Sequence, residues 1–228
     1  LRRPGPARGT PVKPKAFLFD MDGVVVDNMR WHAEAWRRFF LGHGIEMDAR
    51  EFRDKTVGMP THEVLSYFFK RPVPRLEARR LGQTKEELYR TLYGPLRKPA
   101  RGLRAFLSRA RKLGLATGLG TGSKGDNVSF ILDDLDLRGK FDAVVDGSEV
   151  KKGKPDPETF LKLARKLGTA PQDCLVFEDA LLGEEAARRA GMKVVGVLTS
   201  HEPGDFKQAA LEIKDFSSLS VGRLLRLL

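Results

Sequence analysis

Acidic side chains stand in two close pairs that are far apart along the chain. Asp20 and Asp22 directly follow a short apolar run, and Glu178 and Asp179 follow another. Two carboxylates two residues apart repel each other, which raises the pKa of one of them unless a metal ion or a lysine offsets the repulsion. Lys154, in the run KKGKP, is a candidate for that lysine. Carboxylate oxygens are ligands that Mg²⁺ prefers, so the pattern predicts a divalent-cation site beside a lysine.

A second group of residues is suited to binding an anion. Thr121, Gly122, Ser123 and Lys124 follow another apolar run and precede a helical pattern. Hydroxyls and backbone amides at a helix start form a ready site for a phosphate or carboxylate. Acids, an anion-binding loop and a lysine together indicate an anionic substrate held beside Mg²⁺.

Each of these groups has a plainer interpretation by itself. Glu178-Asp179 and the Thr121 and Ser123 hydroxyls are typical helix caps, and Lys154 is typical of an exposed turn. The prediction therefore depends on their conjunction, because complementary groups follow four successive strands. Ligands bind at the carboxyl ends of the strands in such sheets.

A dinucleotide-binding motif competes for the same loop. Residues 120–125 satisfy G-x-G-x-x-G between a strand and a helix, and Asp142 and Asp146 lie about 20 residues on, where a ribose-binding acid would stand. The motif occurs on the second strand rather than the first, and it leaves four residues unexplained: Asp20, Asp22, Lys154 and Asp179. The sequence contains no G-x-x-x-x-G-K-[ST], so a P-loop is not supported.

Apolar runs and helical patterns alternate along most of the chain. The runs 16–19, 115–119, 143–145, 174–177 and 194–198 predict strands, and 102–113, 125–135, 157–167 and 180–190 predict helices. Near-continuous apolar strands separated by helices indicate a parallel sheet covered on both faces. The predicted fold is α/β, with a Rossmann-like parallel-sheet core.

Residues 30–97 interrupt this alternation. Helical stripes recur there without a strand-like run: Trp31, Ala35, Phe39 and Phe40; Val64, Leu65, Phe68 and Phe69; Leu88, Leu92 and Leu96. We predict a flexible basic tail over 1–14, a core formed by 15–29 and 98–228, and an inserted helical cap over 30–97.

Composition excludes several classes of protein. The 228 residues include 41 Lys+Arg, 30 Asp+Glu and one cysteine, with a net charge of +11. No apolar run approaches the roughly 18 residues of a membrane span, and no signal peptide is recognisable. The single Cys174 excludes internal disulfides, so we expect a reducing cytoplasm. Leu-rich residues 219–228 are expected to cover the core of a monomer, with a dimer contact as the alternative.

The positive charge is unevenly distributed. Residues 1–15 contain five basic and no acidic residues, 30–97 contain fourteen and nine, and the remainder contains 22 and 21. Such an excess is compatible with nucleic-acid binding, which would weaken steeply with salt. The sequence has no aromatic-basic platform or recognition motif, so a cap biased toward small anions is the preferred interpretation.

The motifs resemble the four signatures of the haloacid dehalogenase superfamily. They are FDMDGVVVDNM (19–29), GTGSK (120–124), KKGKPDPETF (151–160) and VFEDALLGEEAARRAG (176–191). The helical insertion resembles the small mobile cap of the β-phosphoglucomutase subgroup. This resemblance implies that Asp20 is the nucleophile and Asp22 the general acid/base, and an acid at position 22 argues against dehalogenation.

The resemblance also assigns ligands. It implies Mg²⁺ on the Asp20 carboxylate, the Asp22 carbonyl and Asp179, with Glu178 bound directly or through water. Thr121 and Gly122 would hold phosphoryl oxygens, with Ser123 and Lys124 beside them, while Lys154 would neutralise charge.

Four cap residues are candidates for substrate binding. His32 and Trp36 share a helix face and are similar to a His and a Trp of the mutase cap, and Lys85 is similar to a cap lysine. Trp36 as cap core and Lys85 as a solvated residue are the alternatives. The mutase carries an arginine in the loop that resembles 58–62, whereas here His62 is the nearest candidate.

Four functions follow. We expect a Mg²⁺-dependent phosphatase acting on a small phosphorylated metabolite such as a sugar phosphate. β-Phosphoglucomutase is the first alternative, weakened by the missing arginine. Inorganic pyrophosphatase is the second, and a non-catalytic nucleic-acid binder is the least favoured.

Overall fold

Six parallel strands form one sheet in the computed structural model, which describes residues 15–56 and 59–228. The strands are β1 (Ala16–Phe19), β2 (Ala116–Gly120), β3 (Ala143–Val145), β4 (Cys174–Glu178), β5 (Lys193–Val197) and β6 (Leu211–Ile213). Their order is β3-β2-β1-β4-β5-β6, which confirms the predicted parallel α/β fold. β6 was not predicted, since its three residues include a central glutamate. The predicted tail at 1–14 lies outside the described residues.

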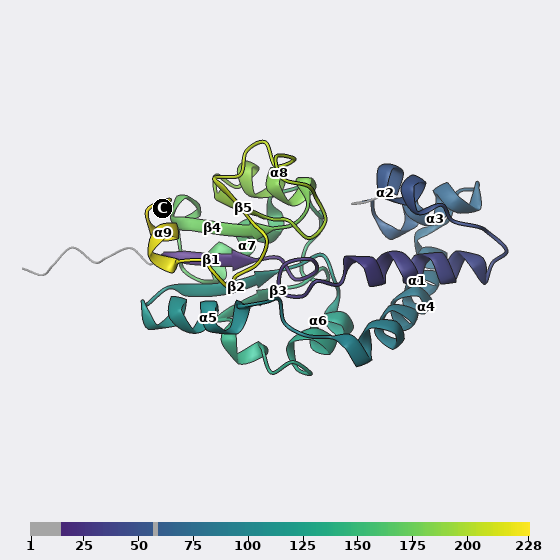
Figure 1. Cartoon of the computed structure of the whole chain (residues 1–228). Coiled ribbons are helices and arrows are strands. Elements are labelled where there is room, and N and C mark those ends of the chain that lie inside the picture. The colour runs from purple at the N-terminus through teal and green to yellow at the C-terminus, as the bar shows by residue number, and fades with distance from the viewer. Residues whose placement is uncertain (1–14, 57–58) are drawn as a thin grey trace, which may run out of the picture.

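Helices cover both faces of this sheet (Figure 1). α5 (Leu103–Lys112), α6 (Gly125–Leu132) and α9 (Val221–Leu225) pack with Phe17 and Phe19 on one face. α7 (Glu158–Lys166) and α8 (Leu181–Arg189) pack with Ala16 and Leu18 on the other. Successive strand side chains point to opposite faces, so the fully apolar run 16–19 supplies both cores. The predicted helices are present, with ends up to three residues inside the predicted bounds.

Aromatic packing holds the central strands together. Phe19 of β1 stacks on Phe177 of β4 with ring centroids 4.7 Å apart, and the two residues are partners in the strand register. Phe106 of α5 packs edge-on against both rings. Such aromatic pairs contribute roughly 0.5–1.5 kcal/mol each beyond the area that they bury. The pairing fixes where the residues after β1 and β4 emerge from the sheet.

Four helices follow β1 and lie to one side of the sheet (Figure 1): α1 (Met29–Leu41), α2 (Ala49–Thr56), α3 (Thr61–Phe69) and α4 (Arg75–Tyr93). The short 3₁₀ helix η1 (Gly94–Leu96) leads back to the sheet. The cap has an apolar core of its own, which includes Trp36, Phe40, Leu65 and Phe68. α2 was not predicted, because Phe52 is its one large apolar residue.

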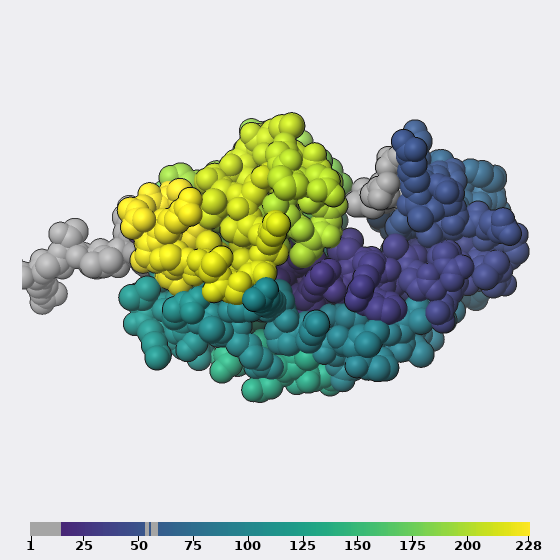
Figure 2. Space-filling model, in the orientation of Figure 1, coloured from purple at the N-terminus to yellow at the C-terminus, as the bar shows by residue number. Residues whose placement is uncertain are grey.

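The cap and the core leave an indentation between them. Figure 2 shows the surface notched between the lime-green region that contains α8 and the blue cap helices, with purple residues of the N-terminal region at its floor. β1 ends facing this region, so the residues after β1 lie where cap and core meet (Figure 1).

Two other sequence expectations concern packing. Cys174 is the buried first residue of β4, and burial raises the pKa of its thiol to about 12. Val221 and Leu224 of α9 are buried in the core, as expected for a core-covering segment at 219–228. No helix among the described residues is both long and apolar enough to span a membrane.

Candidate active site

The first three candidate residues meet because parallel strands end at the same edge of the sheet. Asp20 follows β1 and its backbone N–H donates to the Phe177 carbonyl of β4 at 3.0 Å. Glu178 is the last residue of β4, so it emerges beside Asp20. Lys154, from the segment after β3, reaches both: its Nζ lies 2.8 Å from Asp20 Oδ1 and contacts Glu178 Oε1. Residues predicted separately from three strand ends are therefore in direct contact.

Three buried carboxylates form a cluster that suits a cation. Oxygens of Asp20, Glu178 and Asp179 all lie within 4.8 Å of one another. Two ionised carboxylates at that distance repel by about 3.5 kcal/mol at an effective dielectric constant of about 20. Burial raises the pKa of Asp20 to about 7 despite the opposing charge of Lys154, and burial together with Glu178 raises the pKa of Asp179. One lysine against three acids leaves a deficit of positive charge, which fits a hard divalent cation.

Two glycines make room for these carboxylates. A Cβ built on Gly23 would lie 2.0 Å from Asp179 Oδ2, and one built on Gly183 would lie 2.0 Å from the Glu178 carboxyl. Real Cβ atoms are not found so close to other heavy atoms. Gly23 also has a φ of +77°, which glycine adopts without steric cost. Side chains at these positions would push the acids out of the cluster.

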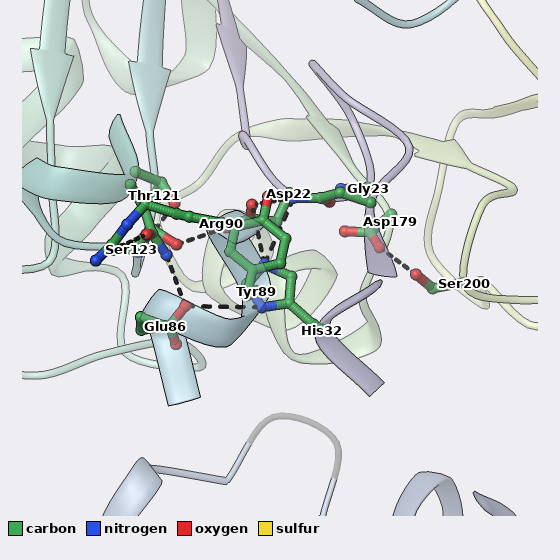
Figure 3. Close-up of polar contacts among 12 residues, drawn as sticks. Asp22, Gly23, His32, Glu86, Tyr89, Arg90, Thr121, Ser123, Asp179 and Ser200 are labelled. Carbon is green, nitrogen blue, oxygen red and sulfur yellow. Dashed lines mark hydrogen bonds and ion pairs between the residues drawn. The ribbon is translucent and has the colours of Figure 1, made fainter. Parts of the chain in front are cut away.

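The segment after β5 adds two residues that sequence reasoning missed. Ser200 Oγ donates to Asp179 Oδ2, as Figure 3 shows, and Thr199 Oγ1 donates to the Gly23 carbonyl at 2.6 Å. The Ser200 hydroxyl thus holds the Asp179 carboxylate from the side of β5. The available signal was positional: these residues follow a fifth strand of the same parallel sheet.

Asp22 has a different environment, although it is only two residues from Asp20. Its carboxylate accepts from Ser123 Oγ and from Asn28 Nδ2, both at 2.6 Å, and lies 3.5 Å from His32 Nε2. Figure 3 shows Asp22, Ser123 and His32 converging between the loop after β2 and the cap. Burial would raise the pKa of Asp22, but these donors outweigh it and lower the pKa to about 2. Asp22 is therefore a carboxylate in this arrangement.

The loop after β2 presents donors beside Asp22. Thr121 is buried and its Oγ1 accepts from the Ser123 backbone N–H at 3.0 Å, which shapes the turn before α6. Gly122 and Lys124 are exposed at the start of α6. The loop thus joins Asp22 through Ser123 and leaves free space at Gly122, where no atom lies within 4 Å of a built Cβ.

The acids that would complete a dinucleotide site are engaged elsewhere. Asp142 accepts from the Thr117 backbone N–H at 2.8 Å, near the start of β2 rather than its end. Asp146 accepts from the Ser148 backbone N–H at 2.7 Å within a turn. Both acids stabilise local backbone, so the competing dinucleotide interpretation of residues 120–125 loses its ribose-binding group.

Three of the four cap candidates lie together. Lys85 is buried, with its Nζ 2.8 Å from His32 Nδ1 and 5.2 Å from the Trp36 ring centroid. The alternative of a solvated Lys85 is therefore wrong, because only 3% of this residue is exposed. Trp36 is itself buried and stacks on Phe40, which supports its role in the cap core. His32 links the group to Asp22.

His62 lies apart from this group. It belongs to the first turn of α3 next to Glu63, with Nε2 3.8 Å from the Glu63 carboxylate. Within 15–56 and 59–228, no hydrogen bond or ion pair joins His62 to another candidate residue. Its predicted role in substrate binding therefore gains no support from contacts in this arrangement.

Two supporting residues, Asn28 and Tyr89, were not among the predicted site residues. Asn28, fully buried, donates to Asp22 and to Tyr89 Oη and accepts from the Gly23 backbone N–H. The Tyr89 ring stacks on His32 with centroids 3.8 Å apart. Asn28 precedes a predicted helix, where asparagine is typical of a cap, yet it makes no cap hydrogen bond there. Its amide instead orients the acid.

The chain is similar to known proteins over most of its length. The model of the haloacid dehalogenase-like hydrolase family matches residues 14–191. The chain is 34% identical over 181 residues to fructose-1-phosphate phosphatase of Escherichia coli, covering 79% of this chain and 95% of that protein. It is 32% identical over 190 residues to β-phosphoglucomutase of Bacillus subtilis, covering 80% and 83%.

Solved structures share the arrangement of core and cap. A haloacid dehalogenase family IA hydrolase from Entamoeba histolytica aligns with a TM-score of 0.88 and 25% identity, covering 93% of this chain and 98% of that one. β-Phosphoglucomutase from Clostridium difficile aligns with a TM-score of 0.81 and 28% identity, covering 93% and 96%. The likeness extends over sheet and cap together.

Proposed function

Because this chain belongs to the haloacid dehalogenase-like hydrolases, we propose that it is a Mg²⁺-dependent phosphatase that hydrolyses a small phosphorylated metabolite, a sugar phosphate, through an aspartyl-phosphate on Asp20. The observation that carries this proposal is the separation of two kinds of carboxylate. Asp20 lies in an acid cluster with Lys154, whereas Asp22 faces the donors Ser123 and His32. A nucleophile and a proton carrier need such different surroundings.

The carboxylates of Asp20, Glu178 and Asp179 would hold Mg²⁺, together with the backbone carbonyl of Asp22. The cluster fits the ion, because its three hard oxygen donors are buried and short of positive charge. When bound, the cation would neutralise charge on the phosphoryl oxygens. Lys154, which contacts Asp20 and Glu178, would do the same, and the Thr121–Ser123 loop would donate hydrogen bonds to those oxygens.

The chemistry then needs two displacements at phosphorus. A carboxylate oxygen of Asp20 attacks phosphorus, the bond to the leaving oxygen of the substrate breaks, and Asp22 gives that oxygen a proton. Water next attacks the phosphorus of the aspartyl-phosphate, the bond to Asp20 breaks, and Asp22 takes the proton of the water. The pKa of about 2 keeps Asp22 ionised before substrate binds, and an ionised carboxylate is the form that can take a proton in the second step. Its acid role in the first step requires that a donor leaves Asp22 when substrate binds, and Ser123, whose loop would then donate to the phosphoryl oxygens, is that donor.

Sugar phosphates are supported as the substrate class by the relatives. Curated relatives include the fructose-1-phosphate phosphatase and a phosphorylated carbohydrates phosphatase of Thermotoga maritima, 30% identical over 191 residues. A screen of sugar phosphates, nucleotides and pyrophosphate with and without Mg²⁺ tests the proposal by released phosphate. Hydrolysis of sugar phosphates that requires Mg²⁺ is expected. Preference for pyrophosphate would contradict the substrate class.

β-Phosphoglucomutase activity is the second candidate, because His32, Trp36 and Lys85 meet in the cap as the resemblance to the mutase implies. Residues 58–62 of the sequence contain no arginine to bind a distal phosphate, which favours hydrolysis. An assay with β-glucose 1-phosphate and β-glucose 1,6-bisphosphate separates the two activities. Glucose 6-phosphate as product would indicate the mutase, and released phosphate the phosphatase.

We also propose that the enzyme works as a monomer in the cytoplasm. The burial of the single cysteine, Cys174, supports a protein without disulfides, and the packing of α9 onto the core of its own chain supports a monomer. Size-exclusion chromatography with light scattering tests the monomer, and a mass twice that of the chain would contradict it.

A further inference from the structure

Three polar residues join cap helix α4 to core helix α6. Arg90 Nη1 donates to Asn127 Oδ1 at 2.8 Å, and Asn127 Nδ2 donates to Glu86 Oε2 at 2.8 Å. Glu86 and Arg90 are four residues apart, so both project from the same face of α4 toward α6. We name Glu86, Arg90 and Asn127 the cap–core clasp. None of the three belongs to the four sequence motifs.

The clasp is continuous with the cap residues that reach Asp22. Glu86 Oε1 accepts from Lys85 Nζ at 2.9 Å, and Lys85 donates to His32 Nδ1 at 2.8 Å. An ammonium group has only hydrogens to offer, so Nδ1 accepts and the His32 ring carries its proton on Nε2. That nitrogen lies 3.5 Å from Asp22 Oδ1. Figure 3 shows the Glu86 carboxylate facing the His32 ring, with the Tyr89 ring stacked on that ring.

The buried polar groups in this chain of contacts all need partners, because little of them is exposed to water. Lys85 and Asn127 are 3% and 5% exposed. A buried ammonium group needs a countercharge, and within the described residues Glu86 is the carboxylate that ion-pairs with Lys85. Glu86 is in turn held from the core side by Asn127, whose amide orientation is set by Arg90. The countercharge of a cap lysine is therefore fixed by a residue of the core.

We propose that Glu86, Arg90 and Asn127 are positioning residues that hold Lys85 against His32, and His32 against Asp22, when α4 rests on α6. The clasp makes the placement of the cap a condition for correct placement of the groups around the proton carrier. The inference rests on the proposed function for the role of Asp22. It assigns roles to three residues that would contact neither the metal ion nor phosphate.

Exchanging the Glu86 carboxylate and the Asn127 amide, first one and then both, tests the proposal. Asn127→Asp keeps an acceptor for Arg90 and places an acid in the first turn of α6, which favours the helix. It removes the donor to Glu86 and sets two carboxylates against each other. We expect kcat to fall about tenfold or more, with KM nearly unchanged, because small displacements in a catalytic constellation are costly. The two facing carboxylates should also lower the melting temperature, so kcat is compared at a temperature at which every variant is folded.

Combining Glu86→Gln with Asn127→Asp restores the pairing. The amide introduced at position 86 can donate to the carboxylate introduced at position 127 and still accept from Lys85, while the negative charge moves from position 86 to position 127. The double variant should therefore be more active than Asn127→Asp alone but less active than wild type. Glu87→Gln, the same change at the next and exposed position of α4, is the matched control and should keep wild-type kcat. Wild-type kcat in Asn127→Asp, or losses in the double variant that equal the product of the two single losses, would overturn the clasp.

A second measurement separates failure of the clasp from failure of the proposed function. The ring ¹⁵N shifts of His32, assigned by comparison with His32→Gln, report the hydrogen bond from Lys85 without any substrate. We expect Asn127→Asp to change them, the double variant to restore them and Glu87→Gln to leave them as in wild type. Unchanged shifts in Asn127→Asp would overturn the clasp even if the wild-type enzyme hydrolysed no phosphomonoester.

Discussion

Asp20 and Asp22 are two residues apart in the sequence, yet their surroundings are opposite. Asp20 faces the acids of the core, and burial with this repulsion raises its pKa to about 7 against the pull of Lys154. Asp22 faces Ser123, Asn28 and His32, and its pKa is lowered to about 2 although burial opposes this. The contrast teaches that the core gathers acids around one carboxylate, where a cation would offset their repulsion, while the loop after β2 and the cap hold the other in its ionised form among hydrogen-bond donors.

The largest expected effect comes from removing the nucleophile. Asp20→Asn should lower kcat at least about 10⁴-fold, because no other oxygen of the cluster is placed to replace the attacking atom. Thermal unfolding without metal should show an intact fold, since the change removes a carboxylate from a cluster of mutually repelling acids. Turnover that survives this substitution would show that Asp20 is not the nucleophile.

The next effect separates the two carboxylates. Asp22→Asn should lower kcat by about 10²–10⁴-fold, the usual contribution of a positioned acid or base. Its affinity for Mg²⁺, measured by calorimetry, should stay near that of the wild type, because the side chain points away from the acid cluster. A loss of Mg²⁺ binding as large as in Asp20→Asn would erase the distinction between the two acids.

A smaller effect follows from crowding the cluster alone. Gly183→Ala places a methyl group where the Glu178 carboxyl lies, so Mg²⁺ affinity should fall about 10- to 100-fold, as when partners of a metal ligand are disturbed. Alanine within a helix is otherwise favoured by about 1 kcal/mol over glycine. Gly139→Ala is the matched control, because no atom lies within 4 Å of its built Cβ. Equal Mg²⁺ affinity in both variants would contradict the close packing.

The smallest expected effect is on the melting temperature, compared with and without Mg²⁺ at two pH values. Because the pKa of Asp20 is raised to about 7, the folded metal-free protein binds more protons than the unfolded chain between about pH 4 and 7. The contribution of Asp20 to the free energy of unfolding therefore falls as pH rises through that window. Mg²⁺ should therefore raise the melting temperature more at about pH 7.5 than at about pH 5. A calorimetric scan at both values checks this, and an equal rise at both would be evidence against the raised pKa.

The sequence predicts the site well where the backbone alone decides the geometry. Parallel strands end at one edge, so Asp20, Lys154 and Glu178 could be assigned to one place from strand order and motifs. The core helices follow from long apolar periodicities, whereas β6 and α2 are too short or too polar to leave such a pattern. The spacing of the residues did not say which acid is the nucleophile and which the general acid/base, and the family resemblance implied those roles for Asp20 and Asp22.

Side-chain contacts between distant segments could not be predicted in the same way. Ser200 reaches Asp179, and Asn127 reaches Glu86, through packing that no local pattern encodes. Lys85 shows the same limit: its sequence surroundings are polar, and only the fold reveals that it is buried beside Trp36. For His62, the resemblance of its loop predicts substrate binding, whereas its ion pair in the structure is with the neighbouring Glu63.

The most direct test of the account is to locate the transferred phosphoryl group. Enzyme mixed with a sugar phosphate and Mg²⁺ is quenched in acid within a turnover, digested and analysed by mass spectrometry. We expect one added phosphoryl group on the peptide that contains Asp20, and none in Asp20→Asn. A phosphoryl group on another residue, or none during continued turnover, would contradict it.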